Sequence, residues 1–153
     1  MVLKNTFFLW DSICLIRNVL VAVDGSENSV RALDFGLDLA EKFGATVTVL
    51  NASESQAMGV VPLEPTTVSG ASMVVFAKDL QRFHEEILVK AVAHAKEVKP
   101  NVVVSSKLRE GDPALEIVAE AKDSGFDVVV VVFRGLGGVR ELFWGILVRR
   151  RLI

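Results

Sequence analysis

Short apolar runs alternate along the chain with longer stretches in which apolar residues recur every three or four positions. The continuous runs are rich in valine and lie at about 19–23 and 127–133, and two further strands are expected at about 46–51 and 102–108. Continuous apolar runs of this length are typical of strands that are buried on both faces, as in a parallel sheet. The stretches at about 27–43, 73–98 and 113–124 have helical periodicity and predict amphipathic helices.

Residues at the boundaries support these helices. Ser26 and Asp112 are residue types preferred as N-caps, and Pro113 follows at a first helical position. A short amphipathic stretch at about 139–149 predicts one more helix at the end of the chain. The alternation of strands and helices predicts an α/β domain, with an open parallel sheet and helices on both faces in the manner of a Rossmann fold.

The pattern places this domain at residues 18–153 and leaves residues 1–17 as an N-terminal extension. The extension contains the apolar run Phe7-Phe8-Leu9-Trp10, which Asp11 interrupts, and no small-residue cleavage site follows. We therefore do not expect a signal peptide. Residues 52–72 are rich in Ser, Thr, Pro and Gly and predict a long loop.

Composition narrows the class of protein. Half of the 153 residues are hydrophobic, yet no apolar stretch approaches the roughly 20 residues that span a bilayer. The net charge of −2 provides no general attraction to nucleic acid or to membranes, so we expect neither as a partner. Cys14 is the only cysteine, which excludes a disulfide framework and fits a reducing cytoplasm.

The sequence offers few candidates for catalysis or metal binding. His84 and His94 are not at metal-ligand spacing, and we interpret both as ordinary helix residues. Asp24 and Asp112 could each act as a base, but no His or Cys is placed to complete a catalytic set. We therefore assign no catalytic residue and no metal ligand.

A glycine loop follows the last valine run. Val128 to Phe133 leads into Gly135, Gly137 and Gly138, whereas the first strand ends at Asp24. Ligands of open α/β sheets bind outside the carboxyl ends of the strands, so an acid and a glycine loop there suggest a site for a phosphate-bearing ligand. The alternative is that the glycines only turn the chain. Neither the dinucleotide fingerprint nor the GxxxxGK[ST] phosphate loop is present.

Three blocks of sequence together resemble the universal stress protein family. They are residues 18–27 with the helix behind them, Glu110 to Ala114 with the next helix, and Val128 to Gly145. Their order and spacing match across residues 18–149. The resemblance implies a five-stranded parallel sheet with strand order 3-2-1-4-5, and a dimer formed through the final strand. It also implies a protein of a family that includes both ATP binders and non-binders.

The resemblance implies a set of nucleotide-binding positions. Asp24 matches the acid that meets the ribose in ATP-binding members. Gly135 and Gly145 match two glycines of the phosphate motif, which are separated by nine residues here as in the family. Glycines at these positions let backbone N–H groups approach the phosphates. The other implied positions are Ala22, Ala52 and Val131 around the adenine, and Gly111 at the end of the third strand.

The chain departs from the family at two motif positions and at its end. Val132 stands where the motif has its first glycine, and Ile146 where it has Ser or Thr. Each loss is expected to weaken phosphate binding by about 1–3 kcal/mol. Too few residues follow for both a last helix and a fifth strand, so we expect the order 3-2-1-4 with the fifth strand missing or replaced. The edge of the fourth strand would then be open, and the apolar extension could cover it.

These observations predict a cytoplasmic, universal-stress-like regulatory protein without enzymatic activity that acts in the stress response. Its crevice would bind ATP, with magnesium, or another adenine nucleotide, in an impaired way, and the chain would self-associate. Two alternatives stay open. One is a weak ATP-hydrolysing or self-phosphorylating enzyme, and the other is an interaction module that has lost nucleotide binding.

Overall fold

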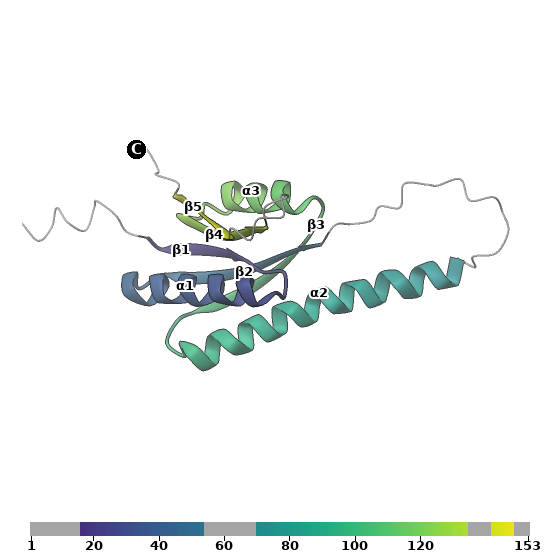
Figure 1. The fold of residues 1–153 in the computed structure, drawn as a ribbon, viewed down its shortest axis with the longest axis horizontal. Helices are drawn as coiled ribbons and strands as arrows, with labels where there is room; N and C mark the ends of the chain where they lie inside the picture. The colour runs from purple at the N-terminus through teal and green to yellow at the C-terminus, as the bar shows by residue number, and fades with distance from the viewer. Residues whose placement is uncertain (1–15, 54–69, 135–141, 149–153) are drawn as a thin grey trace, which may run out of the picture.

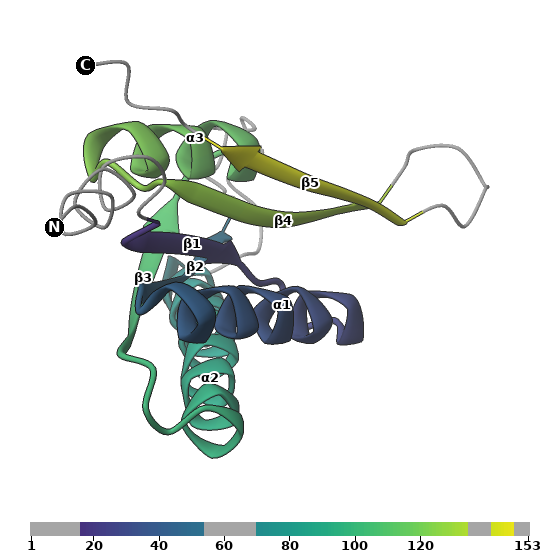
Figure 2. The same ribbon diagram turned by 90° about the vertical axis from the view of Figure 1, so that its left-hand side faces the viewer.

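The computed structural model describes residues 16–53, 70–134 and 142–148, which form a twisted sheet with helices on both faces (Figure 1). The strands are β1 (Asn18–Ala22), β2 (Thr46–Ser53), β3 (Val104–Glu110), β4 (Val128–Arg134) and β5 (Leu142–Val148). The helices are α1 (Glu27–Phe43), α2 (Gly70–Val98) and α3 (Pro113–Asp123). Helices α1 and α2 cover one face and α3 covers the other (Figures 1 and 2). None of the described helices is both long and apolar enough to cross a bilayer.

The sheet has the strand order β3-β2-β1-β4-β5. Strand β1 pairs in parallel with β2 and β4, and β2 pairs in parallel with β3. This confirms the predicted α/β fold with four parallel strands in the order 3-2-1-4. Most of the predicted N-terminal extension, most of the predicted long loop and the glycine loop lie outside the described residues.

Residues 142–148 contradict the predicted last helix. They form β5, which pairs antiparallel with β4 (Figure 2). The segment Leu-Phe-Trp-Gly-Ile-Leu-Val is a continuous apolar run with aromatic and β-branched residues, a composition that favours a strand. Its charged neighbours stand at the ends of the run rather than along one helical face. The fifth strand is therefore replaced rather than missing, and β5 pairs the edge of β4 that we expected to be open.

The larger core lies between the sheet and α1. Val19, Val21 and Val47 are fully buried there against Leu33 and other apolar residues of α1. Full burial of one such side chain stabilises the fold by about 1.5–3 kcal/mol. Gly36 lets α1 approach closely, because a Cβ at this position would lie 2.5 Å from Cγ2 of Val21. This contact fixes α1 against β1, so the start of α1 stays beside the carboxyl end of that strand.

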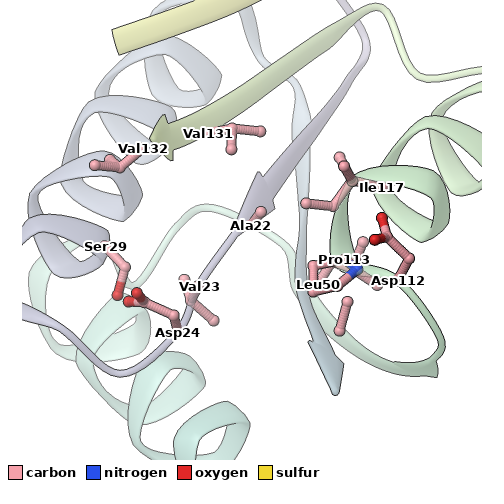
Figure 3. A pocket seen from close by; sticks show the side chains of 12 residues that line it. Ala22, Val23, Asp24, Ser29, Leu50, Asp112, Pro113, Ile117, Val131 and Val132 are labelled. Atoms are coloured by element: carbon pink, nitrogen blue, oxygen red, sulfur yellow. The ribbon is translucent and has the colours of Figure 1, made fainter. Parts of the chain in front are cut away.

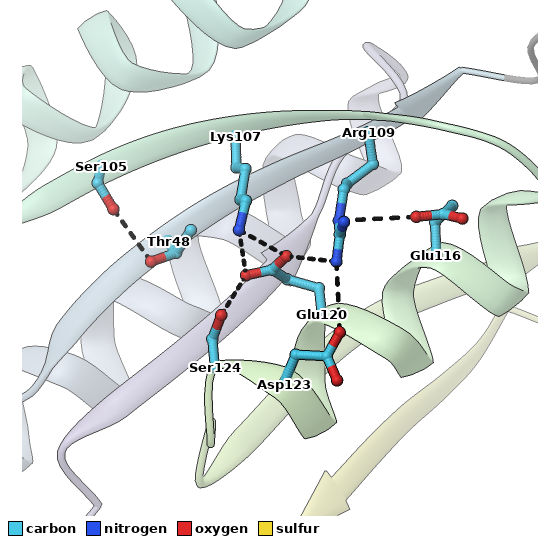
Figure 4. A network of polar contacts seen from close by, with 8 residues as sticks. All are labelled: Thr48, Ser105, Lys107, Arg109, Glu116, Glu120, Asp123 and Ser124. Carbon is cyan, nitrogen blue, oxygen red and sulfur yellow. Dashed lines mark hydrogen bonds and ion pairs between the residues drawn. The ribbon is translucent and has the colours of Figure 1, made fainter.

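Helix α3 packs on the opposite face, over Leu20, Leu50 and Val129, and a network of charges fixes it to β3 (Figure 4). The carboxylate of Glu120, which is 1% exposed, accepts hydrogen bonds from Lys107 Nζ at 2.8 Å and Ser124 Oγ at 2.6 Å.

Arg109 Nη2 lies 3.0 Å from Oε2 of Glu120 and extends the same network. Burial raises the pKa of Glu120, but the hydrogen bonds from Lys107 and Ser124 and the nearby positive charges outweigh it, so the pKa is lowered overall. Glu120 is therefore held as a carboxylate, and it sets the position of α3 along β3.

Candidate functional site

A crevice of about 420 Å³ opens at the carboxyl ends of β1, β2 and β4, where the first turns of α1 and α3 also lie (Figure 3). Its described lining residues are Ala22, Val23, Asp24, Ser29, Leu50, Ala52, Asp112, Pro113, Ala114, Ile117, Val131 and Val132. This is the place where ligands bind in open α/β sheets, because the strand order changes direction between β1 and β4.

Hydrogen bonds fix the chain just beyond β1, and they place the carboxylate of Asp24. Val23 N donates to Leu50 O at 2.8 Å, and Val23 O accepts from Asn51 Nδ2 at 2.7 Å. Asp24 Oδ1 then accepts from Ser26 N at 2.9 Å, which turns the chain into α1. The carboxylate of Asp24 is exposed to solvent in the crevice beside Ser29 (Figure 3).

Helix α2 contributes to this arrangement through His84. Its Nδ1 lies 2.7 Å from Oδ1 of Asn51, which is 2% exposed. An amide oxygen only accepts, so Nδ1 of His84 carries the hydrogen and donates it. The sequence interpretation of His84 as an ordinary helix residue therefore missed a contact that joins α2 to the chain below the crevice.

His94 has a different partner. Its Nε2 lies 2.7 Å from Oδ1 of Asp34, so it joins α2 to α1. Among the described residues, no group of three or more His, Cys, Asp or Glu side chains could hold a metal ion.

The electrostatics of the crevice are one-sided. Its described lining residues include two carboxylates, Asp24 and Asp112, and no Lys, Arg or His. The two helix starts are already capped: Ser26 Oγ accepts from Ser29 N at 3.2 Å, and Asp112 Oδ1 accepts from Leu115 N at 3.0 Å. The described lining can thus pack against a flat apolar group and accept hydrogen bonds, but it provides no cation for a phosphate.

Five of the predicted site residues line the crevice together: Ala22, Asp24, Ala52, Val131 and Val132. Gly111 lies immediately before Asp112, and its N–H donates to Ser53 O at 2.9 Å. Its φ of +145° is a conformation that favours glycine, so this residue shapes the turn from β3 into α3. Gly135 lies outside the described residues.

Gly145 and Ile146 are placed differently from the family motif. Both belong to β5, where Gly145 pairs with Val131 and Ile146 with Val130. The predicted helix at about 139–149 would have included residue 146, so the prediction is wrong for this residue. The antiparallel pairing puts Ile146 beside the middle of β4, whereas a phosphate donor was expected beyond its carboxyl end.

Sequence reasoning missed more than half of the described lining. The residues it did not assign to the site are Val23, Ser29, Leu50, Asp112, Pro113, Ala114 and Ile117. Two signals could have found some of them. The first signal is that Leu50 lies at the end of the second predicted strand. The second is that Ile117 follows Pro113 by four residues, which places Pro113 and Ile117 on one face of α3. Asn51, a polar residue that closes an apolar run, is a further signal of a buried hydrogen-bond partner.

Comparison with known proteins places these features in context. The model of the universal stress protein family matches residues 15–150. Universal stress protein YxiE of Bacillus subtilis is 28% identical over 138 residues, which cover 86% of this chain and 88% of that protein.

Solved structures have the same fold. A universal stress protein in complex with cAMP is 23% identical, has a TM-score of 0.57, and is matched over 82% of this chain and 79% of its own. The universal stress protein of Archaeoglobus fulgidus in complex with dAMP is 21% identical and has a TM-score of 0.51, with 77% of this chain and 82% of that chain covered.

Proposed function

Because the chain belongs to the universal stress protein family, we propose that its crevice binds the nucleoside part of an adenine nucleotide and holds the phosphates weakly. The observation that carries this proposal is the lining itself, which joins apolar side chains with exposed carboxylates and contains no described cation. Family structures in complex with cAMP and with dAMP support an adenine nucleotide as the ligand class.

The nucleoside fits the polar and apolar parts of the crevice. Val131 and Ile117 are partly exposed and offer apolar surface to a base, in a cavity whose volume lies in the usual range for small-molecule sites. Asp24 can accept hydrogen bonds from ribose hydroxyls, and a charged acceptor makes such bonds about twice as strong as neutral ones. The hydrogen bonds that Val23 and Asp24 make with Leu50, Asn51 and Ser26 preorganise this stretch of chain before any ligand arrives.

The phosphates are expected to contribute little affinity. Val132 carries a β-branched side chain where the family motif has a glycine, and Asp24 and Asp112 repel additional negative charge. Magnesium would reduce this repulsion for ATP by neutralising part of the phosphate charge. AMP and ATP should therefore bind with similar and modest affinity.

We propose a regulatory role in the stress response, carried out in the cytoplasm and without catalysis. In the described crevice the hydroxyl of Ser29 donates to Ser26 O at 2.8 Å, and the residue is 3% exposed, which makes it a poor phosphate acceptor. This favours a binding role over ATP hydrolysis or self-phosphorylation. Self-association is expected as well, since β5 stands at one edge of the described sheet and a strand edge is a surface for pairing.

Titration calorimetry with AMP, ADP and ATP, each with and without magnesium, tests the proposal. We expect the dissociation constants of AMP and ATP to lie within about threefold of each other. Their binding free energies would then differ by less than the 1.4 kcal/mol that corresponds to a tenfold change. Strong preference for ATP over AMP would show that phosphate recognition is intact and the proposal wrong. Absence of binding by all three nucleotides would favour an interaction module instead.

A further inference from the structure

A second cavity, separate from the crevice in most of its lining, lies between α1 and α2 on the other side of the chain that leaves β1. Its volume is about 350 Å³. Val30 and Leu33 of α1 form one wall, and Phe83 and Ile87 of α2 form the other. Figure 1 shows these two helices together on one face of the sheet, with the N-terminal part of α2 extending past it. We refer to this cavity as the α1–α2 cleft.

Apolar side chains are left open in the α1–α2 cleft. Phe83 is 57% exposed and Val30 is 38% exposed, although both line the same cavity from neighbouring helices. Single exposed apolar residues are ordinary on protein surfaces, but two that share a cavity offer apolar area to a ligand. The Nε2 of His94, which is hydrogen-bonded to Asp34, joins the helices next to the cavity.

The charges of the cleft indicate which ligand it suits. Lys90 lines it, is exposed, and makes no hydrogen bond or ion pair with any residue that the structure describes. The other basic lining residue, His94, already makes a hydrogen bond with Asp34. Asp24, which also lines the crevice, is the acidic residue of the lining. Lys90 therefore offers an unpaired positive charge beside the apolar walls.

We propose that the α1–α2 cleft is a second ligand site, which takes a small amphipathic anion such as a medium-chain carboxylate. The apolar body of the ligand lies between the two helices, and its carboxylate meets Lys90. This proposal does not rest on nucleotide binding in the crevice, and Lys90 and Ala91 line only the cleft, so variants at these two residues test it separately.

Displacement of the fluorescent anion anilinonaphthalene sulfonate from the purified protein tests the site. Decanoate is expected to displace the probe, and decyltrimethylammonium, which has the same apolar chain and a positive head, is expected to displace it far less. Equal displacement by both compounds would overturn the assignment of an anion.

Two variants on α2 decide where the ligand binds. Lys90→Gln should weaken decanoate binding about three- to fivefold, the effect of a partly exposed ion pair, whereas Lys96→Gln elsewhere on α2 should leave it unchanged. Ala91→Met should weaken binding about tenfold by filling the cleft. Val89→Met should leave binding unchanged, because Val89 is 68% exposed and lies outside the cleft.

Melting curves by circular dichroism check that the four variants stay folded. Lys90 is exposed, so its substitution keeps the test decisive even if Ala91→Met disturbs the helix packing. Unchanged decanoate affinity in folded Lys90→Gln and Ala91→Met would place the probe elsewhere on the protein and overturn the proposal.

Discussion

The crevice has two different sides. Beside β1 and α3 its described lining is held in place by hydrogen bonds, and beside β4 its described lining consists of two valines. We call the first the polar side, formed by Asp24, Asp112 and their partners, and the second the valine side, formed by Val131 and Val132. The polar side is built to hold acceptors in fixed positions. The valine side offers shape and apolar area but no side-chain donor. This difference is the basis of our proposal that the crevice recognises a nucleoside more strongly than its phosphates.

The strongest test removes the buried support of the polar side. Asn51→Leu leaves the buried Val23 O and the part-buried Nδ1 of His84 without their partner, and an unsatisfied buried group costs about 1–3 kcal/mol. We expect the free energy of unfolding to fall by about 3 kcal/mol in urea titrations at neutral pH. Thr48→Ala, which removes an exposed hydroxyl on the same strand, is the control and should cost much less. Equal losses would mean that Asn51 does not support the polar side.

A second test concerns the attachment of α3, which carries Asp112 into the crevice. Glu120→Gln removes the charge that Lys107 and Arg109 meet, and we expect a loss of about 1–2 kcal/mol, since Lys107 is half exposed. The pKa of Glu120 is lowered in the folded state, so its contribution is complete above its ordinary value of about 4.5.

The same contribution is lost as the pH falls through the lower pKa of the folded state. Urea titrations from pH 7 to pH 3 should therefore show a steeper loss of stability in the unchanged protein than in Glu120→Gln. Parallel pH profiles for the two proteins would contradict a lowered pKa at this residue. The valine side has no titratable side chain and should not contribute to the difference.

Asp24→Ala tests ligand binding on the polar side. Loss of a charge-assisted hydrogen bond to the ribose should weaken AMP and ATP alike, by about 1.5–3 kcal/mol or more than tenfold in the dissociation constant. Asp24→Asn is the matched control, because it keeps an acceptor of the same size and should lose less. Calorimetry that shows a loss for ATP alone would place Asp24 near the phosphates instead of the ribose.

Asp112→Asn tests the repulsion of phosphates. Asparagine is as good an N-cap as aspartate, so α3 should stay capped while the crevice loses one negative charge. ATP affinity should rise about threefold and AMP affinity less, and added salt should reduce the gain. Asp79→Asn, an exposed position on α2, should change neither. A gain of equal size for both nucleotides would show that charge does not separate them.

The smallest effect is expected from Ile146→Ser, which restores a hydroxyl of the family motif. Residue 146 belongs to β5 and pairs with Val130, so the new hydroxyl would not stand at a helix start. We expect the ratio of ATP to AMP affinity to stay unchanged in calorimetry, provided that the variant stays folded. A clear gain for ATP would mean that this segment approaches the phosphates after all.

The resemblance to the universal stress protein family implied the order of the four parallel strands, whereas the amino-acid sequence by itself determined the strands and the position of Asp24 at the end of the first of them. Both of these depend on local or near-local patterns: continuous valine runs, Ser26 and Asp112 as caps, and Pro113 at the start of α3. Such signals act within a few residues, so the chain shows them without knowledge of its partners.

Only the tertiary structure decided the role of residues 142–148 and the support behind Asp24. An apolar run of seven residues fits a strand or a buried helix, and the antiparallel pairing with β4 selects the strand. Asn51 and His84 are 33 residues apart, so their contact exists only when β2 and α2 are packed together. The absence of cations from the described crevice lining is likewise a property of how strands and helices meet, because Lys107 and Arg109 of β3 are directed to Glu120 instead.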